Sequence, residues 1–410
     1  TITNDDAATV TISNVTQNEG NAGTSNFTFV ITLNGSVDAP VSFNAGTVDG
    51  SATVGNNDYD LTVGALTFPA DGPATQTESA AIAVHGDMTV ESDETFLLRL
   101  SSLSAGGRNV TFSPGAGATL DGTATIVNDD AATLTLSGGG SQTEGTSHTF
   151  TATLSHAVQG GFTVAYNSND GTTNPAVAGS DYTDNDGTFT FLGNAGENMS
   201  WTVLTSTDNT VELNETFTAT LGTPSAAGIT VSGSPQTGTI ANDDQAIVSI
   251  TNVSQAENLT PQVFTVSISN PVDVAVSATA NTSNGTATTG DSDYSAVTNQ
   301  TVSFSINSTT SQTVNVTIIN DNKVESNETY SLILSALSAS GRNVIFTGSG
   351  STLTGSGTIV NDDVSTLTLT GGGSGNEGNS GQSGKIFTAT LSNPVQDGFT
   401  LNFTTNDGSA

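Results

Sequence analysis

The chain has 410 residues and carries 39 acidic residues against five basic ones, which gives a formal net charge of −34. This charge argues against nucleic acid as a partner and disfavours anionic membrane surfaces, because binding to phosphate requires cations. The chain has no cysteine, which excludes disulfides and zinc–thiolate sites, and it has no apolar run of about 18 residues that would predict a membrane-spanning helix.

A repeated tripeptide organises the chain. Asn-Asp-Asp occurs at residues 4–6, 128–130, 242–244 and 361–363, and the segments between these copies share further markers in a constant order. A period of about 120 residues indicates a tandem array of domains. The predicted divisions are the end of a preceding repeat at 1–6, whole domains at 7–130, 131–244 and 245–363, and a partial domain at 364–410. Since the last piece is too short to close a domain, we expect the parent protein to continue.

Within each repeat the apolar residues follow the period of a strand. In residues 27–33, Phe and aliphatic residues alternate with polar ones, and residues 96–100 repeat the pattern. Such alternation predicts strands with one buried and one wet face. About seven such segments per repeat, separated by turn residues and without an amphipathic helical stretch, predict an all-β fold of tandem immunoglobulin-like antiparallel β-sandwiches with Greek-key connections.

More than half of the acidic residues recur in register. Each repeat has an early Glu, the Asp of an Asp-Tyr pair, an Asp and a Glu in Asp-x-x-x-Glu-x-x-Glu-Thr-aromatic, and the final Asp-Asp. The candidate metal ligands are Glu19, Asp58, Asp87, Glu91, Asp129 and Asp130 in the first repeat, Glu144, Asp181, Asp208, Glu212, Asp243 and Asp244 in the second, and Glu257, Asp293, Asp321, Glu325, Asp362 and Asp363 in the third.

The spacing of these acids predicts that they converge. Loops that alternate between the two ends of a sandwich would bring all six to one end. Carboxylates about 4–5 Å apart repel by about 3–4 kcal/mol per pair at an effective dielectric near 20. Six together, with few Lys or Arg residues available, require a divalent cation or raised pKa values. A site with oxygen ligands only suits Ca²⁺.

The motif order resembles that of the Calx-β domain. That family is known from regulatory domains of sodium–calcium exchangers, from an integrin subunit and from large bacterial surface and adhesin proteins. The resemblance covers nearly the whole chain, and it implies an immunoglobulin-like sandwich with calcium ions at one tip, held by the acids named above.

The sequence departs from the family pattern in three ways. The Asn of Asn-Asp-Asp replaces an acid found in some members, which implies fewer ions per domain. Lys323 lies in the acidic loop of the third repeat, where it would weaken that site, and Glu257 is followed by Asn258 instead of Gly. Acids are also common at turns because their side chains cap turn backbones, but a fixed register in three copies favours metal ligands.

Arg108 and Arg342 occupy equivalent loops late in the first and third repeats. Two interpretations remain open for them: docking on an acidic neighbouring domain or filament, or an ordinary solvated loop. We predict no catalytic residue, because the only recurrent polar constellation is better used for metal ligands and a catalytic site in every domain would be unusual.

Each final Asp-Asp runs directly into the first strand of the next repeat, so a cation there would stiffen the junction. The sequence predicts a structural or adhesive stalk, or a filament segment, of a large cell-surface or extracellular and bacterial protein. Its expected partners are neighbouring repeats, other copies of the chain or a surface ligand. The alternatives are a calcium-sensing regulatory module and accessory domains of a larger extracellular enzyme.

Overall fold

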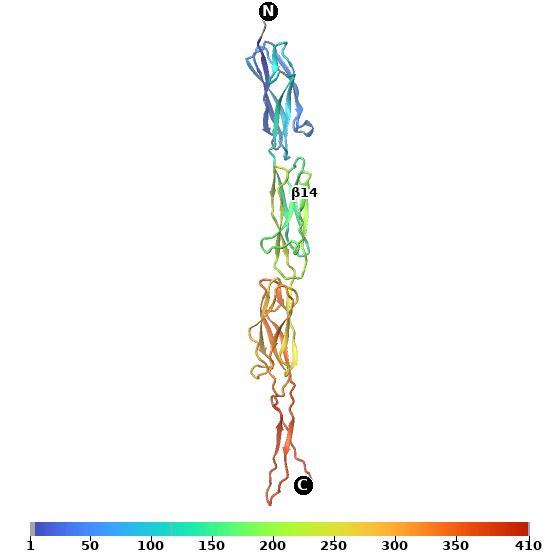
Figure 1. The fold of residues 1–410 in the computed structure, drawn as a ribbon, viewed down its shortest axis with the longest axis vertical. Coiled ribbons are helices and arrows are strands. Elements are labelled where there is room, and N and C mark those ends of the chain that lie inside the picture. Colours follow the sequence, from blue (N-terminus) through green and yellow to red (C-terminus); the bar gives the residue numbers. More distant parts are fainter. Residues whose placement is uncertain (1–4, 116, 409–410) are drawn as a thin grey trace. The chain divides into compact units, whose positions relative to one another are not determined.

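The computed structural model describes residues 5–115 and 117–408, and within them it contains strands, one 3-10 turn, η1 (Val54–Asn56), and no α-helix (Figure 1). The described residues include no helix with the length and apolar character that a membrane crossing needs. Residues 1–4 of the predicted preceding repeat lie outside the described residues. The all-β prediction is confirmed.

Three successive groups of nine strands form three β-sandwiches, which we call the first, second and third repeats. The first comprises β1 (Ala8–Ile12), β2 (Val15–Asn18), β3 (Gly23–Asn34), β4 (Val41–Asp49), β5 (Val63–Phe68), β6 (Thr75–Gly86), β7 (Glu94–Ser104), β8 (Val110–Phe112) and β9 (Thr119–Val127). The second comprises β10 (Ala132–Gly138), β11 (Gly140–Thr143), β12 (Ser147–Leu154), β13 (Phe162–Asp170), β14 (Gly187–Phe191), β15 (Asn198–Leu204), β16 (Glu215–Leu221), β17 (Ile229–Ser232) and β18 (Gln236–Ala241). The third comprises β19 (Ala246–Ile250), β20 (Val253–Ala256), β21 (Gln262–Ile268), β22 (Val276–Asn284), β23 (Gln300–Phe304), β24 (Gln312–Val316), β25 (Glu328–Ser338), β26 (Val344–Phe346) and β27 (Leu353–Val360).

The sheets of the three repeats have the same order. One sheet runs β6-β3-β1-β8 in the first repeat, β15-β12-β10-β17 in the second and β24-β21-β19-β26 in the third. The facing sheet runs β2-β9-β7-β4-β5, β11-β18-β16-β13-β14 and β20-β27-β25-β22-β23. These are the two layers of the predicted immunoglobulin-like sandwich.

Each repeat has nine strands, where the sequence predicted about seven, partly because the first strand is split. In the first repeat, β1 pairs antiparallel with β3, whereas β2 pairs parallel with β9 in the other sheet. At the crossing point, Ser13 Oγ accepts a hydrogen bond from Val30 N–H at 2.9 Å and Asn14 Oδ1 accepts one from Thr123 N–H at 2.9 Å. These side chains satisfy backbone donors that lose their strand partners where the strand changes sheets.

Each core is centred on a stacked aromatic pair taken from two of the recurrent motifs. The Tyr of Asp-Tyr stacks on the aromatic residue of Glu-Thr-aromatic, with ring centroids 4.1 Å apart for Tyr59–Phe96 and 4.5 Å apart for Tyr294–Tyr330. All four rings are at most 2% exposed. Because the acids directly precede these aromatics, the stack fixes two acidic loops relative to one another.

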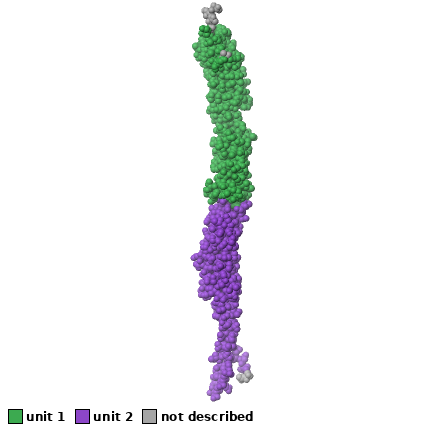
Figure 2. Space-filling view, in the orientation of Figure 1, with its two compact units in different colours: residues 1–206, 216–240 green, residues 207–215, 241–410 purple. Residues whose placement is uncertain are grey.

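The chain divides into two compact units (Figure 2). The first spans residues 1–206 and 216–240, and the second spans residues 207–215 and 241–410. The short segment 207–215 belongs to the second unit because Val211 is fully buried in the core cluster of the third repeat. Val90 of the first repeat likewise belongs to the core cluster of the second repeat, within the first unit.

The fourth repeat contributes a single two-stranded sheet, β28 (Leu367–Gly371) paired antiparallel with β29 (Phe387–Leu391). Its apolar side chains are exposed, including Phe387 at 57% and Phe403 at 89%. In the described residues of this repeat there is no second layer to bury them.

Replacing Phe217 by Ala will destabilise the second repeat by about 3–5 kcal/mol, the usual loss for a large core aromatic. Phe217 is fully buried and packs on Tyr182 and Phe150 at 5.0 and 6.0 Å. Trp201 is the only tryptophan and lies in the same core, so its fluorescence during urea unfolding measures the change. The control is Leu192→Ala, at a residue 76% exposed, which should change the stability by less than about 0.5 kcal/mol.

Candidate metal sites

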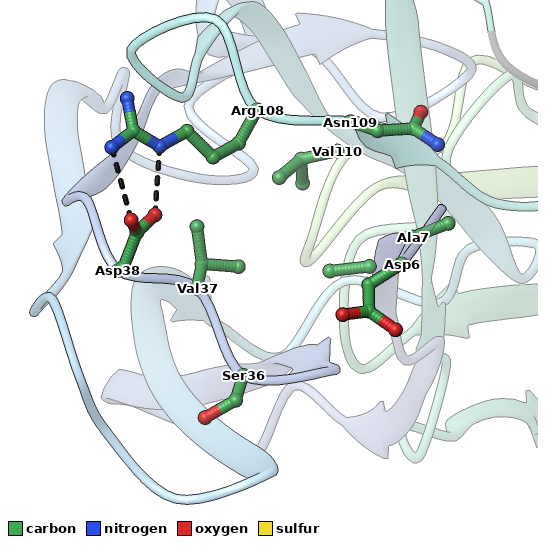
Figure 3. A pocket seen from close by; sticks show the side chains of 9 residues that line it. Asp6, Ala7, Ser36, Val37, Asp38, Arg108, Asn109 and Val110 are labelled. Carbon is green, nitrogen blue, oxygen red and sulfur yellow. Dashed lines mark hydrogen bonds and ion pairs between the residues drawn. The ribbon is translucent and has the colours of Figure 1, made fainter. Parts of the chain in front are cut away.

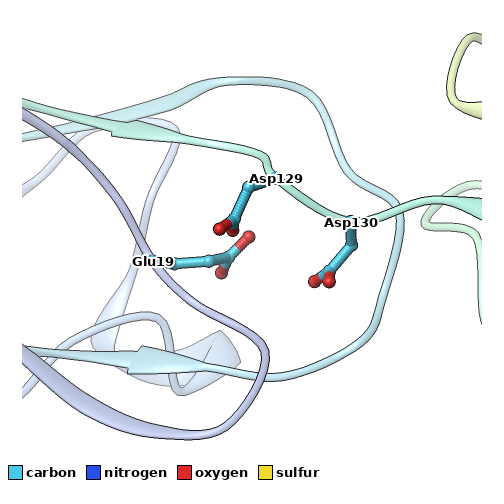
Figure 4. Close-up of side chains that lie close together, drawn as sticks. All are labelled: Glu19, Asp129 and Asp130. Carbon is cyan, nitrogen blue, oxygen red and sulfur yellow. The ribbon is translucent and has the colours of Figure 1, made fainter.

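The final Asp-Asp of the first repeat lies beside the early Glu of the same repeat. One carboxylate oxygen each from Glu19, Asp129 and Asp130 lies within 4.8 Å of the others. In Figure 4, Glu19 and Asp129 direct their carboxylates toward one another, and Asp130 follows at the start of the segment that leaves the repeat. Glu19 and Asp130 are only 7% and 6% exposed. The structure thus brings together three of the six acids predicted for this repeat.

The loop that carries Glu19 also holds both aspartates by hydrogen bonds. Gly20 N–H donates to Asp129 Oδ1 at 3.2 Å, and Asn21 Nδ2 donates to Asp130 Oδ1 at 2.8 Å. The other oxygen of Asp130, Oδ2, is buried and has no hydrogen-bond partner among the described residues. A buried carboxylate oxygen without a donor is costly unless something else satisfies it.

Asp87 approaches this cluster because the preceding residue is a glycine. A Cβ on Gly86 would lie 1.9 Å from the carbonyl oxygen of Gly20, so only Gly allows β6 to end against the loop of Glu19. The negative charges of Asp87 and Glu91 both contribute to the raised pKa of Glu19. Four acids therefore surround Glu19.

Burial and mutual repulsion keep protons on this cluster. Burial is the main cause that raises the pKa of Glu19 to about 8 and that of Glu91 to about 7, with the neighbouring carboxylates adding to both shifts. Burial and Asp129 raise the pKa of Asp130 in the same way. A bound divalent cation would remove the repulsion and let these groups ionise, so the chemistry of the site fits Ca²⁺.

A second group of acids includes residues that the sequence analysis left out. In the third repeat, carboxylate oxygens of Asp293, Glu325 and Glu328 lie within 4.8 Å of one another. Glu328, the second Glu of Val-Glu-x-x-Glu, is 8% exposed, and its pKa is raised chiefly by burial. Glu94 is its counterpart in the first repeat, with a pKa raised by burial and by Asp58. The recurrence of this second Glu in the repeated motif is the sequence pattern that could have identified it as a site residue.

The Asp of each Asp-Tyr pair also organises its own loop. Its carboxylate accepts a hydrogen bond from a backbone N–H four or five residues earlier in the chain, at 2.6 Å in all three repeats. The donor and acceptor pairs are Thr53 and Asp58, Val177 and Asp181, and Thr288 and Asp293. The Asp of the next acidic motif caps a turn in each repeat through the N–H two residues later, at 2.5–2.7 Å, in Asp87, Asp208 and Asp321. In each case this bond occupies one carboxylate oxygen.

The Asn of Asn-Asp-Asp has a structural role that the sequence analysis missed. Asn128 Oδ1 accepts from Glu91 N–H at 3.0 Å, while its Nδ2 donates to the carbonyl of Asp130 at 3.1 Å. The same two bonds recur at Asn242 and Asn361. A carboxylate has no N–H to donate, so Asn in this position joins the Glu loop to the Asp-Asp backbone.

The third repeat brings together Glu257, Asp321 and Asp363, again within 4.8 Å. Glu257 is 4% exposed, its pKa is raised by burial and by Asp363, and its Oε1 lacks a hydrogen-bond partner among the described residues. Asp362 is held by Asn258, whose Nδ2 donates to Asp362 Oδ2. The departure from Glu-Gly to Glu-Asn thus supplies a ligand-orienting amide.

The acids predicted for the second repeat are divided between the two units. Glu144 and Asp181 belong to the first unit, and Asp208, Glu212, Asp243 and Asp244 belong to the second. Within the second unit, burial and the charges of Asp243 and Asp208 raise the pKa of Asp244, and its buried Oδ2 has no hydrogen-bond partner in the described ranges.

The two arginines singled out in the sequence each pair with an aspartate of their own repeat. Arg108 forms a bidentate pair with Asp38 at 2.7 and 3.1 Å, and Arg342 forms one with Asp273 at 2.7 and 2.6 Å. Lys323 forms an ion pair with the predicted ligand Glu325, and the weakening of the third site stays a prediction.

Comparisons with known proteins agree with this architecture. A family profile described as the Calx-beta domain matches residues 3–131, 140–252 and 242–363. The chain belongs to the Calx-beta family. Its tandem Calx-beta domains confirm the predicted resemblance. Calcium is the cofactor of this family, which confirms the predicted cofactor, whereas the individual ligands stay a prediction.

Three solved structures resemble parts of the chain. An apo-form Calx CBD1 domain has 26% identity, covers 30% of this chain and 100% of its own, and has a TM-score of 0.25. CBD12 from CALX1.2 has 18% identity, with 50% and 82% coverage and a TM-score of 0.23. The calcium binding domain CBD12 of CALX1.1 has 19% identity, with 57% and 99% coverage and a TM-score of 0.26. A comparison with curated protein sequences gave no match.

Without calcium, the first Calx-beta repeat will lose stability as the pH rises from about 5 to 8.5. The pKa of Glu19 is raised to about 8 in the folded state, so the folded repeat binds more protons than the unfolded chain until the pH passes that value. We expect the midpoint of thermal unfolding to fall by about 5 °C or more across this range. Glu19→Gln should flatten the dependence, and an unchanged slope in that variant would contradict the assignment.

Replacing Lys323 by Met will strengthen calcium binding in the third repeat by about tenfold, because it frees Glu325 from its ammonium partner. Calcium titration followed by hydrogen exchange in residues 321–328 measures the change. Lys385→Met, in the fourth repeat, is the control with the same loss of charge and should leave the titration unaltered. Equal titrations for all three proteins would show that Lys323 does not compete with the ion.

Proposed function

We propose that this chain is a calcium-stiffened structural or adhesive segment of a large cell-surface protein. The observation that carries the proposal is that the loop of the first repeat that enters the next repeat also supplies Glu91, one of the acids of the candidate site. An ion held by those acids would act on the junction between the repeats.

The first junction lies within one compact unit, so its contacts can be followed directly. Val90 N–H donates to the carbonyl of Ala157 at 2.9 Å, and the carbonyl of Val90 accepts from Gln159 N–H at 2.9 Å. The next residue, Glu91, accepts a hydrogen bond from Gln159 Nε2 at 3.3 Å. A candidate ligand therefore touches the second repeat.

The same junction also has a covalent connection that begins at a site residue. Asp130 is separated from β10, the first strand of the second repeat, by Ala131 alone. Glu19, Asp129, Asp130 and Glu91 would hold the ion, which would supply the positive charge that this acidic cluster lacks. Both connections between the repeats would then be tied to one site, and bending at the junction would require ligands to move.

The third junction repeats this arrangement within the second unit. Val324 N–H donates to the carbonyl of Pro394 at 2.9 Å, and Gln396 N–H donates back to Val324 at 2.9 Å. Gln396 Nε2 also donates to Glu328 Oε1 at 2.9 Å. The acids of the third repeat are therefore coupled to the fourth repeat as those of the first are coupled to the second.

A calcium-sensing regulatory module is the second candidate function. The hydrogen bond between Gln159 and Glu91 favours it as well, because loss of the ion would change a contact with the next repeat. Calorimetric titration separates the two. Sensors bind calcium at about 10⁻⁷–10⁻⁵ M and extracellular modules at about 10⁻⁴–10⁻³ M. Retained protons weaken binding near neutral pH, since the ion must displace them, and this supports the structural role.

The proposed location rests on composition and repetition. A net charge of −34 requires counter-cations to keep the chain compact, and millimolar extracellular calcium would supply them. Tandem modules with contacts only between neighbours suit a structural array. A surface ligand, other copies of the chain and bacterial origin belong to the same proposal.

Calcium will raise the unfolding midpoint of the full chain by about 10 °C at a concentration one hundred times the dissociation constant, as measured by scanning calorimetry against a chelator. Magnesium should do much less, because it tolerates irregular sites poorly. Asp130→Asn should remove the shift of the first repeat, and Glu78→Gln, in strand β6, should preserve it. Identical midpoints with and without calcium would mean that the acids are turn residues and the array is metal-independent.

A further inference from the structure

One valine in each repeat is inserted into the following repeat. It is the Val of Val-Glu-x-x-Glu-Thr-aromatic, and the inserted residues are Val90, Val211 and Val324. Their backbones form isolated parallel bridges with Val158, Val272 and Val395. Val90 and Val211 are 3% and 0% exposed and belong to the core clusters of the repeats that receive them.

The receiving segment has the same form each time. The inserted Val donates its N–H to the carbonyl of the first residue of a tripeptide and accepts from the N–H of the third residue. The tripeptides are residues 157–159, 271–273 and 394–396, and the bonds measure 2.9–3.2 Å. Each tripeptide has Val at its centre and follows the strand that pairs with the first strand of its repeat.

The first repeat contains the corresponding tripeptide, Ser36-Val37-Asp38, after β3. Its local setting matches that of the third repeat: Asp71 N–H donates to the carbonyl of Val37 at 2.9 Å, as Asn307 N–H does to that of Val272 at 2.9 Å. Unlike its counterparts, Val37 forms no bridge with any residue in the described ranges.

A pocket of ≈ 200 Å³ opens beside this tripeptide (Figure 3). Residues 6–8, 36–38 and 108–110 line it. Figure 3 shows the side chains of Val37, Val110 and Ala7 around the same hollow, with the paired Asp38 and Arg108 at one side. The pocket thus offers an apolar interior with a charged rim.

The equivalent position in the second repeat is filled, and its occupant indicates which side chain would fit the pocket of the first repeat. Asn109 and Gly228 are equivalent, because their carbonyls accept from Ala8 and Ala132 N–H at 3.0 Å in the same register. A Cβ on Gly228 would lie 2.6 Å from Cγ1 of the inserted Val90, so this position adjoins the valine. The third repeat, which receives Val211, has Asn343 in this place, as the first has Asn109, and the Asn343 carbonyl accepts from Ala246 N–H at 3.1 Å. The place beside Asn109 therefore corresponds to the place that a valine fills in the second repeat.

We propose that the pocket at Val37, Ala8 and Asn109 is a docking site for the Val-Glu loop of another Calx-beta domain. The incoming Val would lie along residues 36–38 as a parallel bridge. The shape and the backbone hydrogen bonds select an extended, β-branched residue, and the rim selects the acid that follows it.

The rim charge supports this partner. In the third repeat, Arg342 is paired with Asp273 of the tripeptide. It also interacts electrostatically with Glu212, the residue that follows the inserted Val211. Arg108 and Asp38 form the same pair beside the pocket of the first repeat. The guanidinium of Arg108 would face the Glu of the incoming loop, so the partner is an acidic Calx-beta loop and not a basic peptide.

The test places a second copy of residues 7–130 before Ala7 of the full chain, in place of residues 1–6. The new join reproduces the existing one, because Asp5-Asp6-Ala7-Ala8 repeats Asp129-Asp130-Ala131-Ala132. Hydrogen–deuterium exchange of residues 36–41 is measured in calcium. We expect exchange to slow by about tenfold or more in the extended chain, since the N–H of Asp38 gains an acceptor.

Two variants of the added copy make the test specific. Val90→Asp in that copy should restore fast exchange at residues 36–41, whereas Val63→Asp, at a residue 77% exposed in the first repeat, should not. Residues 157–161 and 271–275, where the pocket is filled, serve as protected standards in the unextended chain. Equal exchange with and without a folded added copy, or protection that survives Val90→Asp, would overturn the proposal.

Discussion

The repulsion between buried carboxylates at the end of each sandwich is the constraint on which the rest of the structure depends. Glu19 and Asp130 are almost fully buried beside Asp129, and the whole chain has only five basic residues. Without a cation the cluster retains protons, as the raised pKa values of Glu19 and Glu91 show. The surrounding residues hold the acids in place. Gly86 permits close approach of β6 to the loop of Glu19, Asn128 joins two loops, and the Tyr59–Phe96 stack fixes two of the acidic motifs.

One loop takes part in both the acidic cluster and the junction, through the adjacent residues Val90 and Glu91. Val90 packs in the core of the second repeat, while the adjacent Glu91 faces the acids of its own repeat. A change in the charge of the cluster would therefore act on a residue that is locked into the neighbouring domain. This coupling gives the proposed stiffening a physical route, and it needs no long-range conformational pathway. Contacts of this kind also explain why residues 207–215 belong to the compact unit of the third repeat and not to that of the second.

The few basic residues are used at specific positions. Arg108 and Arg342 form bidentate pairs with Asp38 and Asp273, the third residues of the equivalent tripeptides 36–38 and 271–273. Lys323 pairs with Glu325 in an acidic group, where its charge would oppose ion binding. An acidic chain with so few cations can distinguish its repeats through them, because each added positive charge changes the local field strongly when little else compensates it.

The sequence by itself determined the all-β class, the Calx-beta resemblance, the tandem repeats and the recurrent acids, since all of these are periodic along the chain and a period can be read without coordinates. The tertiary structure decided which acids meet. It divided them into two adjoining groups, added Glu94 and Glu328, and gave the Asn of Asn-Asp-Asp a bracing role that depends on the positions of two separate loops. It also showed that the valine before the first Glu is buried in the next repeat. A valine at the start of a strand-like motif reads as part of its own core, and its true neighbours lie about 70 residues further along the chain, a separation that no local pattern records.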